Sequence, residues 1–174
     1  MKSYYPNMFI VAGSGRNVGK TTFCSKIIQR FSMENRIIAL KISNHFHELG
    51  DDVRIIFQSE SYTIAEEISG ISEKDLALFL KAGASSSFFI MAQNGSLTIA
   101  IEKLNMLVDL SADLIVAESA SLLEDFKPGI AAYITDIQDI SSVNGFDMVC
   151  HFNNEDIQGN IDKISLSGNN WRFY

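Results

Sequence analysis

A short apolar segment, a glycine-punctuated loop and an amphipathic helix follow one another near the start of the chain. Residues 8–12 (MFIVA) are all apolar and run directly into Gly13, a pattern typical of a strand buried on both faces of a parallel sheet. Apolar residues then recur with helical spacing between residues 23 and 31, so a helix is expected to begin close to Lys20. Residues 36–42 (RIIALKI) predict a second strand. Together these segments predict a β–α–β unit.

The remainder of the chain continues the alternation of strands and helices. Further strands are expected at residues 87–91, 112–117 ending in Glu118, 130–134 and 148–152. Helices are expected from Ser72 as N-cap to Gly83, from Ser96 to Leu110, and over residues 156–164. Three segments stay ambiguous: 53–57 (strand or hairpin arm), 62–68 (strand or helix) and 171–174 (strand or docked tail). The pattern predicts an α/β fold with a doubly wound, mainly parallel sheet flanked by helices, and a single domain over residues 1–174.

The net charge of the chain limits the classes of partner that are expected. The net charge is -7 and basic residues do not cluster, so nucleic acid is not expected as a partner. The N-terminus has no signal-peptide pattern and the apolar runs are too short to span a bilayer, which predicts a cytoplasmic protein without a membrane partner. Cys24 and Cys150 lie in apolar stretches and are expected to be reduced core thiols.

The segment between the first strand and the first helix has the composition of a phosphate-binding loop. Glycines let backbone N–H groups turn around an anion, and the following helix presents its positive end to the same anion. Lys20 adds a charge for the β and γ oxygens, and the Thr21 hydroxyl can ligate Mg²⁺. The predicted cofactor-binding residues are Gly13, Ser14, Gly15, Arg16, Asn17, Val18, Gly19, Lys20, Thr21 and Thr22. The alternative is a glycine turn followed by a lysine that only starts a helix.

The strict pattern GxxxxGK[ST] is not met, because its first glycine would fall on Ser14, which Gly13 and Gly15 flank. This variant, VAGSGRNVGKTT, resembles the loop of the P-loop NTPases that include dethiobiotin synthetase and nitrogenase iron protein. Within that class the chain is most similar to the MobB family, the molybdopterin-guanine dinucleotide biosynthesis protein B family. The counterparts that carry the resemblance are residues 40–47 (LKISNHFH), Lys74-Asp75 with residues 81–84 (KAGA), Ile115–Ser119, and Phe126-Lys127-Pro128.

The chain also departs from the family pattern. The family's serine and arginine after the aspartate are Leu76 and Leu78 here, and the glycine after the strand-end glutamate is Ser119. The resemblance implies a P-loop NTPase fold, GTP as the nucleotide, a homodimer and a protein partner in molybdenum-cofactor biosynthesis. No Asn-Lys-x-Asp motif selects guanine, so the residues themselves leave GTP or ATP open.

Candidate metal ligands and catalytic residues gather where strands end. Glu118 ends a buried strand at the carboxyl edge, where it can hold Mg²⁺ or instead cap a neighbouring loop. The predicted catalytic residues are Lys20, Thr21 and Glu118, and the predicted metal ligands are Thr21, Glu118 and Asp75. The resemblance assigns Asp75 to a segment near the γ-phosphate, whereas its position alone suits the first turn of a helix. Asp51 and Asp52 are competing acids.

Other polar residues follow predicted strands. His45 and His47 are spaced to lie on one side of an extended chain, as substrate or metal ligands or as solvated loop residues. Residues 135–136 and 153–156 are candidates for contacts to the base. Arg16 can donate charge to the phosphates or face solvent.

Three functions compete. The first is a Mg²⁺-dependent nucleotide-binding protein with slow hydrolysis, resembling the accessory proteins of molybdenum-cofactor biosynthesis. The second is an ATP-dependent small-molecule ligase similar to dethiobiotin synthetase. The third is a nucleotide-binding adaptor without catalysis. A nucleotide kinase is disfavoured because no arginine occurs between Arg54 and Arg172, whereas kinases use several lid arginines.

Overall fold

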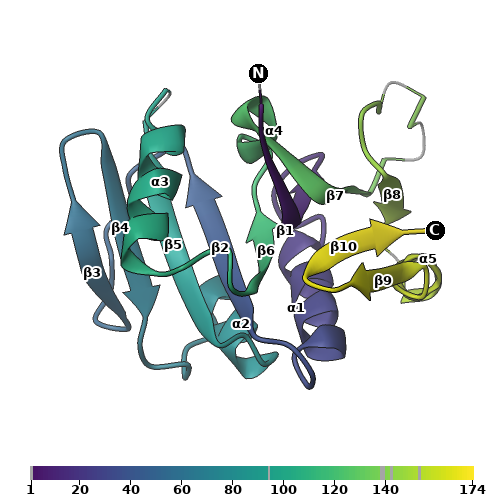
Figure 1. The fold of residues 1–174 in the computed structure, drawn as a ribbon, viewed down its shortest axis with the longest axis horizontal. Coiled ribbons are helices and arrows are strands. Elements are labelled where there is room, and N and C mark those ends of the chain that lie inside the picture. The colour runs from purple at the N-terminus through teal and green to yellow at the C-terminus, as the bar shows by residue number, and fades with distance from the viewer. Residues whose placement is uncertain (1, 94, 138–139, 142, 153) are drawn as a thin grey trace.

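An eight-stranded sheet flanked by helices forms the centre of the protein. The computed structural model describes residues 2–93, 95–137, 140–141, 143–152 and 154–174. The strands lie in the order β3-β4-β5-β2-β6-β1-β7-β8, with the β3–β4 hairpin at one edge and β8 at the other (Figure 1). The sheet strands are β1 (Ser3–Gly13), β2 (Ile37–Ser43), β3 (Val53–Gln58), β4 (Tyr62–Glu67), β5 (Ser86–Ala92), β6 (Leu114–Glu118), β7 (Phe126–Thr135) and β8 (Met148–His151). The helices are α1 (Lys20–Phe31), α2 (Asp75–Lys81), α3 (Leu97–Leu107), α4 (Leu122–Asp125) and α5 (Asn154–Ile161).

Most of the sheet is parallel. The pairs β5–β2, β2–β6, β6–β1, β1–β7 and β7–β8 are parallel, whereas β4 runs antiparallel to both β5 and β3. This confirms the predicted α/β class with a mainly parallel sheet. Because the parallel strands share one carboxyl edge, the loop after β1 lies beside the ends of β6 and β7.

The central strand β1 is buried on both faces, as its apolar sequence predicts. Met8 and Ile10 pack into the cluster that contains α3, and Phe9 and Val11 pack into the cluster that contains α1. All four side chains are 0% exposed. A fully apolar strand is needed here because alternate residues face opposite layers of helices.

The C-terminal segment forms a second, two-stranded sheet of β9 (Ile164–Ser167) and β10 (Asn170–Phe173), in which β10 lies beside β1 and β7 (Figure 1). Trp171 anchors it: the indole ring lies edge-on to the rings of Phe9 at 5.4 Å and Phe31 at 5.1 Å, and its N–H donates to the Asn7 carbonyl at 2.9 Å. The terminal residues are therefore a strand that contributes to the core. The helix expected over 156–164 instead ends at Ile161, and β9 was not predicted.

Several element boundaries differ from the sequence-based expectations. Helix α2 has Lys74, not Ser72, as N-cap, because the Ser72 hydroxyl accepts the Lys74 N–H in the preceding turn. Gly83, with φ +110°, follows the end of α2 as expected. Helix α3 stops at Leu107, short of the expected end, and β7 begins at Phe126. Residues 62–67 form a strand, β4. Among the described residues, no helix has the length and apolar character needed to cross a bilayer.

Candidate functional site

The start of the glycine-rich loop is attached to β7. Gly13 ends β1 opposite Ile134, and a Cβ on Gly13 would lie 2.6 Å from the Ile134 carbonyl oxygen, so only glycine allows this approach. The Ser14 N–H donates to that carbonyl at 3.1 Å, and the Ser14 hydroxyl donates to Asp136 Oδ1 at 3.1 Å. Asp136, a predicted base-contact candidate, thus lies against the loop. Residues 15–17 are exposed and Val18 is buried.

The loop ends on the open N-terminus of α1. Gly19 is the N-cap with φ +92°, and as a glycine it has no side chain with which to cap the helix. The amides of the first turn, Lys20 to Thr22, have no partner within the helix, and the helix dipole adds positive potential at the same place. A backbone with these properties binds phosphate. The Lys20 ammonium donates to the Gly15 carbonyl, so the lysine lies across the loop.

Phe152 is a neighbour of the loop that no sequence motif marks. A Cβ on Gly19 would lie 1.9 Å from Cδ2 of Phe152, so the ring packs directly over the glycine. Phe152 follows β8 and is 47% exposed. It occupies the side of the loop near β8, and only its place at the end of the strand expected over 148–152 hinted at this. Of the predicted base-contact segment 153–156, Asn153 and the side chains of residues 154–156 lie outside the described part of the structure.

Four polar side chains form a continuous network from α1 to α2. The Thr21 hydroxyl donates to Glu118 Oε2 at 2.7 Å, the Lys41 ammonium lies 3.4 Å from Glu118 Oε1, and Lys41 also pairs with Asp75. Glu118 is 8% exposed, at the end of β6. Thr21, Glu118 and Asp75 are therefore brought together as predicted candidates, with Lys41 between the two acids.

The charges of this network affect two pKa values. Burial alone would lower the pKa of Lys41, but the negative charges of Glu118 and Asp75 outweigh it and raise the pKa above its usual value. Burial, reinforced by the charge of Glu118, raises the pKa of the Cys24 thiol well above its usual value. Lys41 thus stays protonated and Cys24 stays a neutral thiol. Both cysteines are buried, in keeping with the prediction of core thiols.

The residues near Thr21 fit a Mg²⁺ ion that arrives with a phosphate. A hydroxyl and a carboxylate oxygen at 2.7 Å from each other are ligands of the kind that Mg²⁺ prefers. Asp75 faces Lys41, so it is separated from Thr21 by a cation. In the part of the chain that the structure describes, no cluster of three or more His, Cys, Asp or Glu side chains is arranged to hold a metal. A metal here would need phosphate oxygens and water to complete its coordination.

The other polar candidates lie outside this network. His47 stacks on Phe89 at 6.2 Å and its Nε2 lies 3.1 Å from the Ser43 hydroxyl, while His45 is exposed. Asp51 is exposed, and Asp52 Oδ1 accepts from Lys74 at 2.9 Å.

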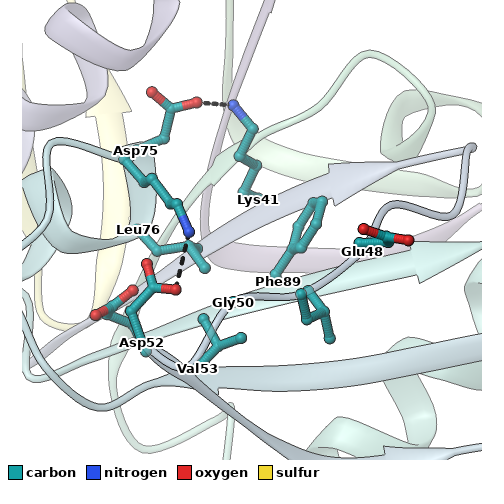
Figure 2. A pocket seen from close by; sticks show the side chains of 11 residues that line it. Lys41, Glu48, Gly50, Asp52, Val53, Asp75, Leu76 and Phe89 are labelled. Carbon is teal, nitrogen blue, oxygen red and sulfur yellow. Dashed lines mark hydrogen bonds and ion pairs between the residues drawn. The ribbon is translucent and has the colours of Figure 1, made fainter.

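A pocket of about 180 Å³ adjoins Lys41, between α2 and the residues around β3 and β4 (Figure 2). Lys41 reaches Asp75 at one side of the pocket, and Asp52 lies at the other side beyond Leu76. Glu67, the last residue of β4, also lines it. No sequence signal marked Glu67, because its position depends on the antiparallel pairing of β4 with β3, which sets it opposite Val53.

Comparison of the chain with models of protein families, with the curated proteins and with the solved structures finds no match. A function for this chain therefore has to be inferred from its fold and its side-chain geometry.

Proposed function

We propose that the protein binds a nucleoside triphosphate, GTP or ATP, with Mg²⁺ at residues 13–22, and hydrolyses it slowly. The observation that carries the proposal is the N-terminus of α1, which has a glycine as its N-cap, directly follows the glycine-rich loop and holds Lys20 at its first position. The chain belongs to the class of α/β folds in which ligands bind at the carboxyl edge of the parallel strands. The loop lies at that edge.

The triphosphate is bound mainly by backbone amides. The net charge of -7 does not favour a polyanion, so we propose that binding depends on local donors. The amides of the first turn of α1 and the Lys20 ammonium provide them. Lys20 exchanges its intramolecular contact with the Gly15 carbonyl for phosphate oxygens.

Thr21 and Glu118 hold the metal end of the nucleotide. Bound Mg²⁺ supplies positive charge to the β- and γ-phosphates. Thr21 contributes its hydroxyl, Glu118 contributes a carboxylate directly or through water, and Lys41 orients Glu118 by pairing with its other oxygen. This arrangement positions and neutralises charge but provides no arginine from the segment 55–171, which is why slow turnover is proposed.

The wider role we propose is that of an accessory protein, with a protein partner and as a homodimer, resembling the MobB family of molybdenum-cofactor biosynthesis. This role is supported by the segments of the chain that resemble the family. Three residues from those segments, Lys41, Asp75 and Glu118, lie in one network. Leu76 and Leu78, where the family has polar residues, indicate a changed acceptor or partner.

Nucleotide titration tests the proposal. Fluorescently labelled GTP and ATP are titrated into the purified protein with Mg²⁺ and with a chelator, and Lys20→Ala is expected to weaken binding by about a hundredfold or more, since it removes the charge-assisted contacts of the ammonium. Lys26→Ala, which removes the same charge six positions along the same helix, is the matched control and should bind like the parent chain.

Two results would overturn the proposal. One is the absence of saturable binding of either nucleotide up to millimolar concentration. The other is equal affinity of the Lys20→Ala variant and the Lys26→Ala control. A single-turnover hydrolysis assay with bound nucleotide then measures whether the site is catalytic or only binds.

A further inference from the structure

The pocket beside Lys41 contains an uncompensated buried carboxylate. Glu67 is 4% exposed, and its Oε1 accepts from the Ser69 amide, the Ser69 hydroxyl and the Gly70 amide at 2.7–3.1 Å. Its Oε2 is buried and has no hydrogen-bond partner among the residues that the structure describes. A buried carboxylate oxygen without a donor is costly, so its retention points to a ligand that supplies the donor.

The same pocket holds a second oxygen of this kind. Among the described residues, five buried side-chain oxygens have no hydrogen-bond partner, and only two belong to carboxylates: Asp52 Oδ2 and Glu67 Oε2. Both residues line this pocket. The other three oxygens are neutral hydroxyls outside it, on Thr63, Ser87 and Ser165. Two acidic residues that line this pocket therefore each keep one buried carboxylate oxygen without a hydrogen-bond donor.

The charges around the pocket favour a cation. Its lining includes two lysines, Lys41 and Lys74, and four acids, Glu48, Asp52, Glu67 and Asp75. Both lysines are already paired, Lys41 with Asp75 and Glu118, and Lys74 with Asp52. The remaining charge of the lining, on Glu48 and Glu67, is negative.

The walls indicate an organic cation in place of a metal ion. Leu49, Val53, Leu76 and Phe89 contribute an apolar surface, whereas a divalent metal requires oxygen ligands on all sides. Among the described residues, no three His, Cys, Asp or Glu side chains are arranged to hold a metal ion. A pocket of about 180 Å³ is several times the roughly 30 Å³ share of one water molecule.

We propose that this pocket binds a small primary amine, with its ammonium group donating to Glu67 Oε2 and Asp52 Oδ2 and its hydrocarbon body against Leu76 and Phe89. The three N–H donors of an ammonium suit two carboxylate oxygens. The pocket shares Lys41 and Asp75 with the Thr21–Glu118 network, so the amine lies beside the candidate nucleotide site. Its binding does not depend on the proposed nucleotide function.

The backbone amides of Ser69 and Gly70 donate to Glu67 and therefore report on binding at this carboxylate. In amide NMR spectra at neutral pH, n-butylammonium chloride is expected to shift the Ser69 and Gly70 resonances saturably, because these N–H groups donate to the other oxygen of the same carboxylate. Neutral 1-butanol and an equal concentration of sodium chloride are the reference titrations, and neither should reproduce the shifts.

Substitutions at and near the pocket test where butylammonium binds. Glu67→Gln should weaken butylammonium binding about tenfold or more, since the charge-assisted bond is lost. Glu66→Gln, the same change one residue earlier on β4, should stay within about twofold. Gly50→Ala is a second variant, because its added Cβ would lie 2.5 Å from Asp52 Oδ1 and 2.9 Å from Lys74 Nζ and should also weaken binding.

The proposal is overturned by any of three results: no saturable shift at tens of millimolar butylammonium, equal binding of butanol, or equal binding by the Glu67→Gln variant. Saturable binding of Ca²⁺ or Mg²⁺ chloride at Ser69 and Gly70 that excludes butylammonium would also overturn it in favour of an inorganic cation. The Lys20→Ala variant should bind butylammonium normally, so failure of the nucleotide proposal and failure of this one are distinguishable.

Discussion

Two buried glutamates, each the last residue of a strand, differ in whether both of their carboxylate oxygens have a hydrogen-bond or ion-pair partner. Glu118 ends the parallel strand β6, and both of its oxygens are engaged, by Thr21 and by Lys41. Glu67 ends the antiparallel strand β4 with one oxygen held by three donors and the other without a partner. The first carboxylate is internally balanced, whereas the second lacks a positive partner.

The difference separates two kinds of binding region. At the end of β1 the backbone itself is the receptor: glycines and the first turn of α1 create positive potential without a basic surface. In the pocket beside α2, binding capacity comes from side chains that converge from separate segments. The first region suits an anion and the second a cation, and Lys41 lines the second while pairing with Glu118 of the first.

The largest expected effect tests whether the backbone defines the loop region. Gly13→Ala should lower the free energy of unfolding by about 2–3 kcal/mol, because its Cβ would press on the Ile134 carbonyl of a neighbouring strand. Gly15→Ala is the matched control: no atom lies within 4 Å of its added Cβ, so a change below about 0.5 kcal/mol is expected. Urea unfolding measures both. Equal losses would mean that the close β1–β7 approach does not constrain the loop.

The next effect concerns the balanced carboxylate. Glu118→Gln should lower the free energy of unfolding by about 1–3 kcal/mol, because Lys41 loses one of its two anionic partners in a partly buried position. The factor by which Mg²⁺ tightens nucleotide binding should also fall about tenfold, because the substitution removes the carboxylate proposed to hold the metal. Urea unfolding and nucleotide titration with and without Mg²⁺ check the two parts. A variant as stable as the parent chain would remove the contrast with Glu67.

The uncompensated carboxylate should respond in the opposite direction. Glu67→Gln keeps the acceptor for Ser69 and Gly70 but removes a buried negative charge, so the free energy of unfolding without ligand should rise by about 1 kcal/mol. Glu66→Gln, which loses an exposed pair with Arg54, should change it by less than about 0.5 kcal/mol. Destabilisation by Glu67→Gln as large as that caused by Glu118→Gln would contradict the contrast between the two carboxylates.

The smallest expected effect is on how the stability of the protein depends on pH, through Asp52 in the wall of the pocket. The hydrogen bond from the Lys74 ammonium lowers the pKa of Asp52 below its ordinary value. Its stabilising contribution is therefore full above the unfolded pKa of about 4 and is lost as the pH falls through the lower folded pKa. Asp52→Asn should be less sensitive to acid than the parent chain over that range, measured as the urea midpoint against pH. Asp51→Asn is the exposed control, and a parallel response of all three chains would contradict the assignment.

The sequence alone determined the parts of the protein that depend on contiguous residues. The apolar run of β1, the glycine loop and the helical spacing of α1 are local patterns, so the strand–loop–helix unit and the mainly parallel sheet were predictable. Glu118 was predictable as a strand-end acid, since parallel strands place their ends at one edge. Helix ends such as Lys74 in place of Ser72 were missed, because a single hydroxyl contact decides them.

Only the tertiary structure decided what lies between distant segments. Lys41 between Asp75 and Glu118, Phe152 over Gly19 and Trp171 against Phe9 join residues that no spacing rule connects. Glu67 became significant through the antiparallel pairing of β4 with β3, where it lies opposite Val53, and no local pattern marks this pairing. A phosphate loop is encoded in one short stretch because backbone amides form it, whereas a side-chain pocket exists only after folding has brought its walls together.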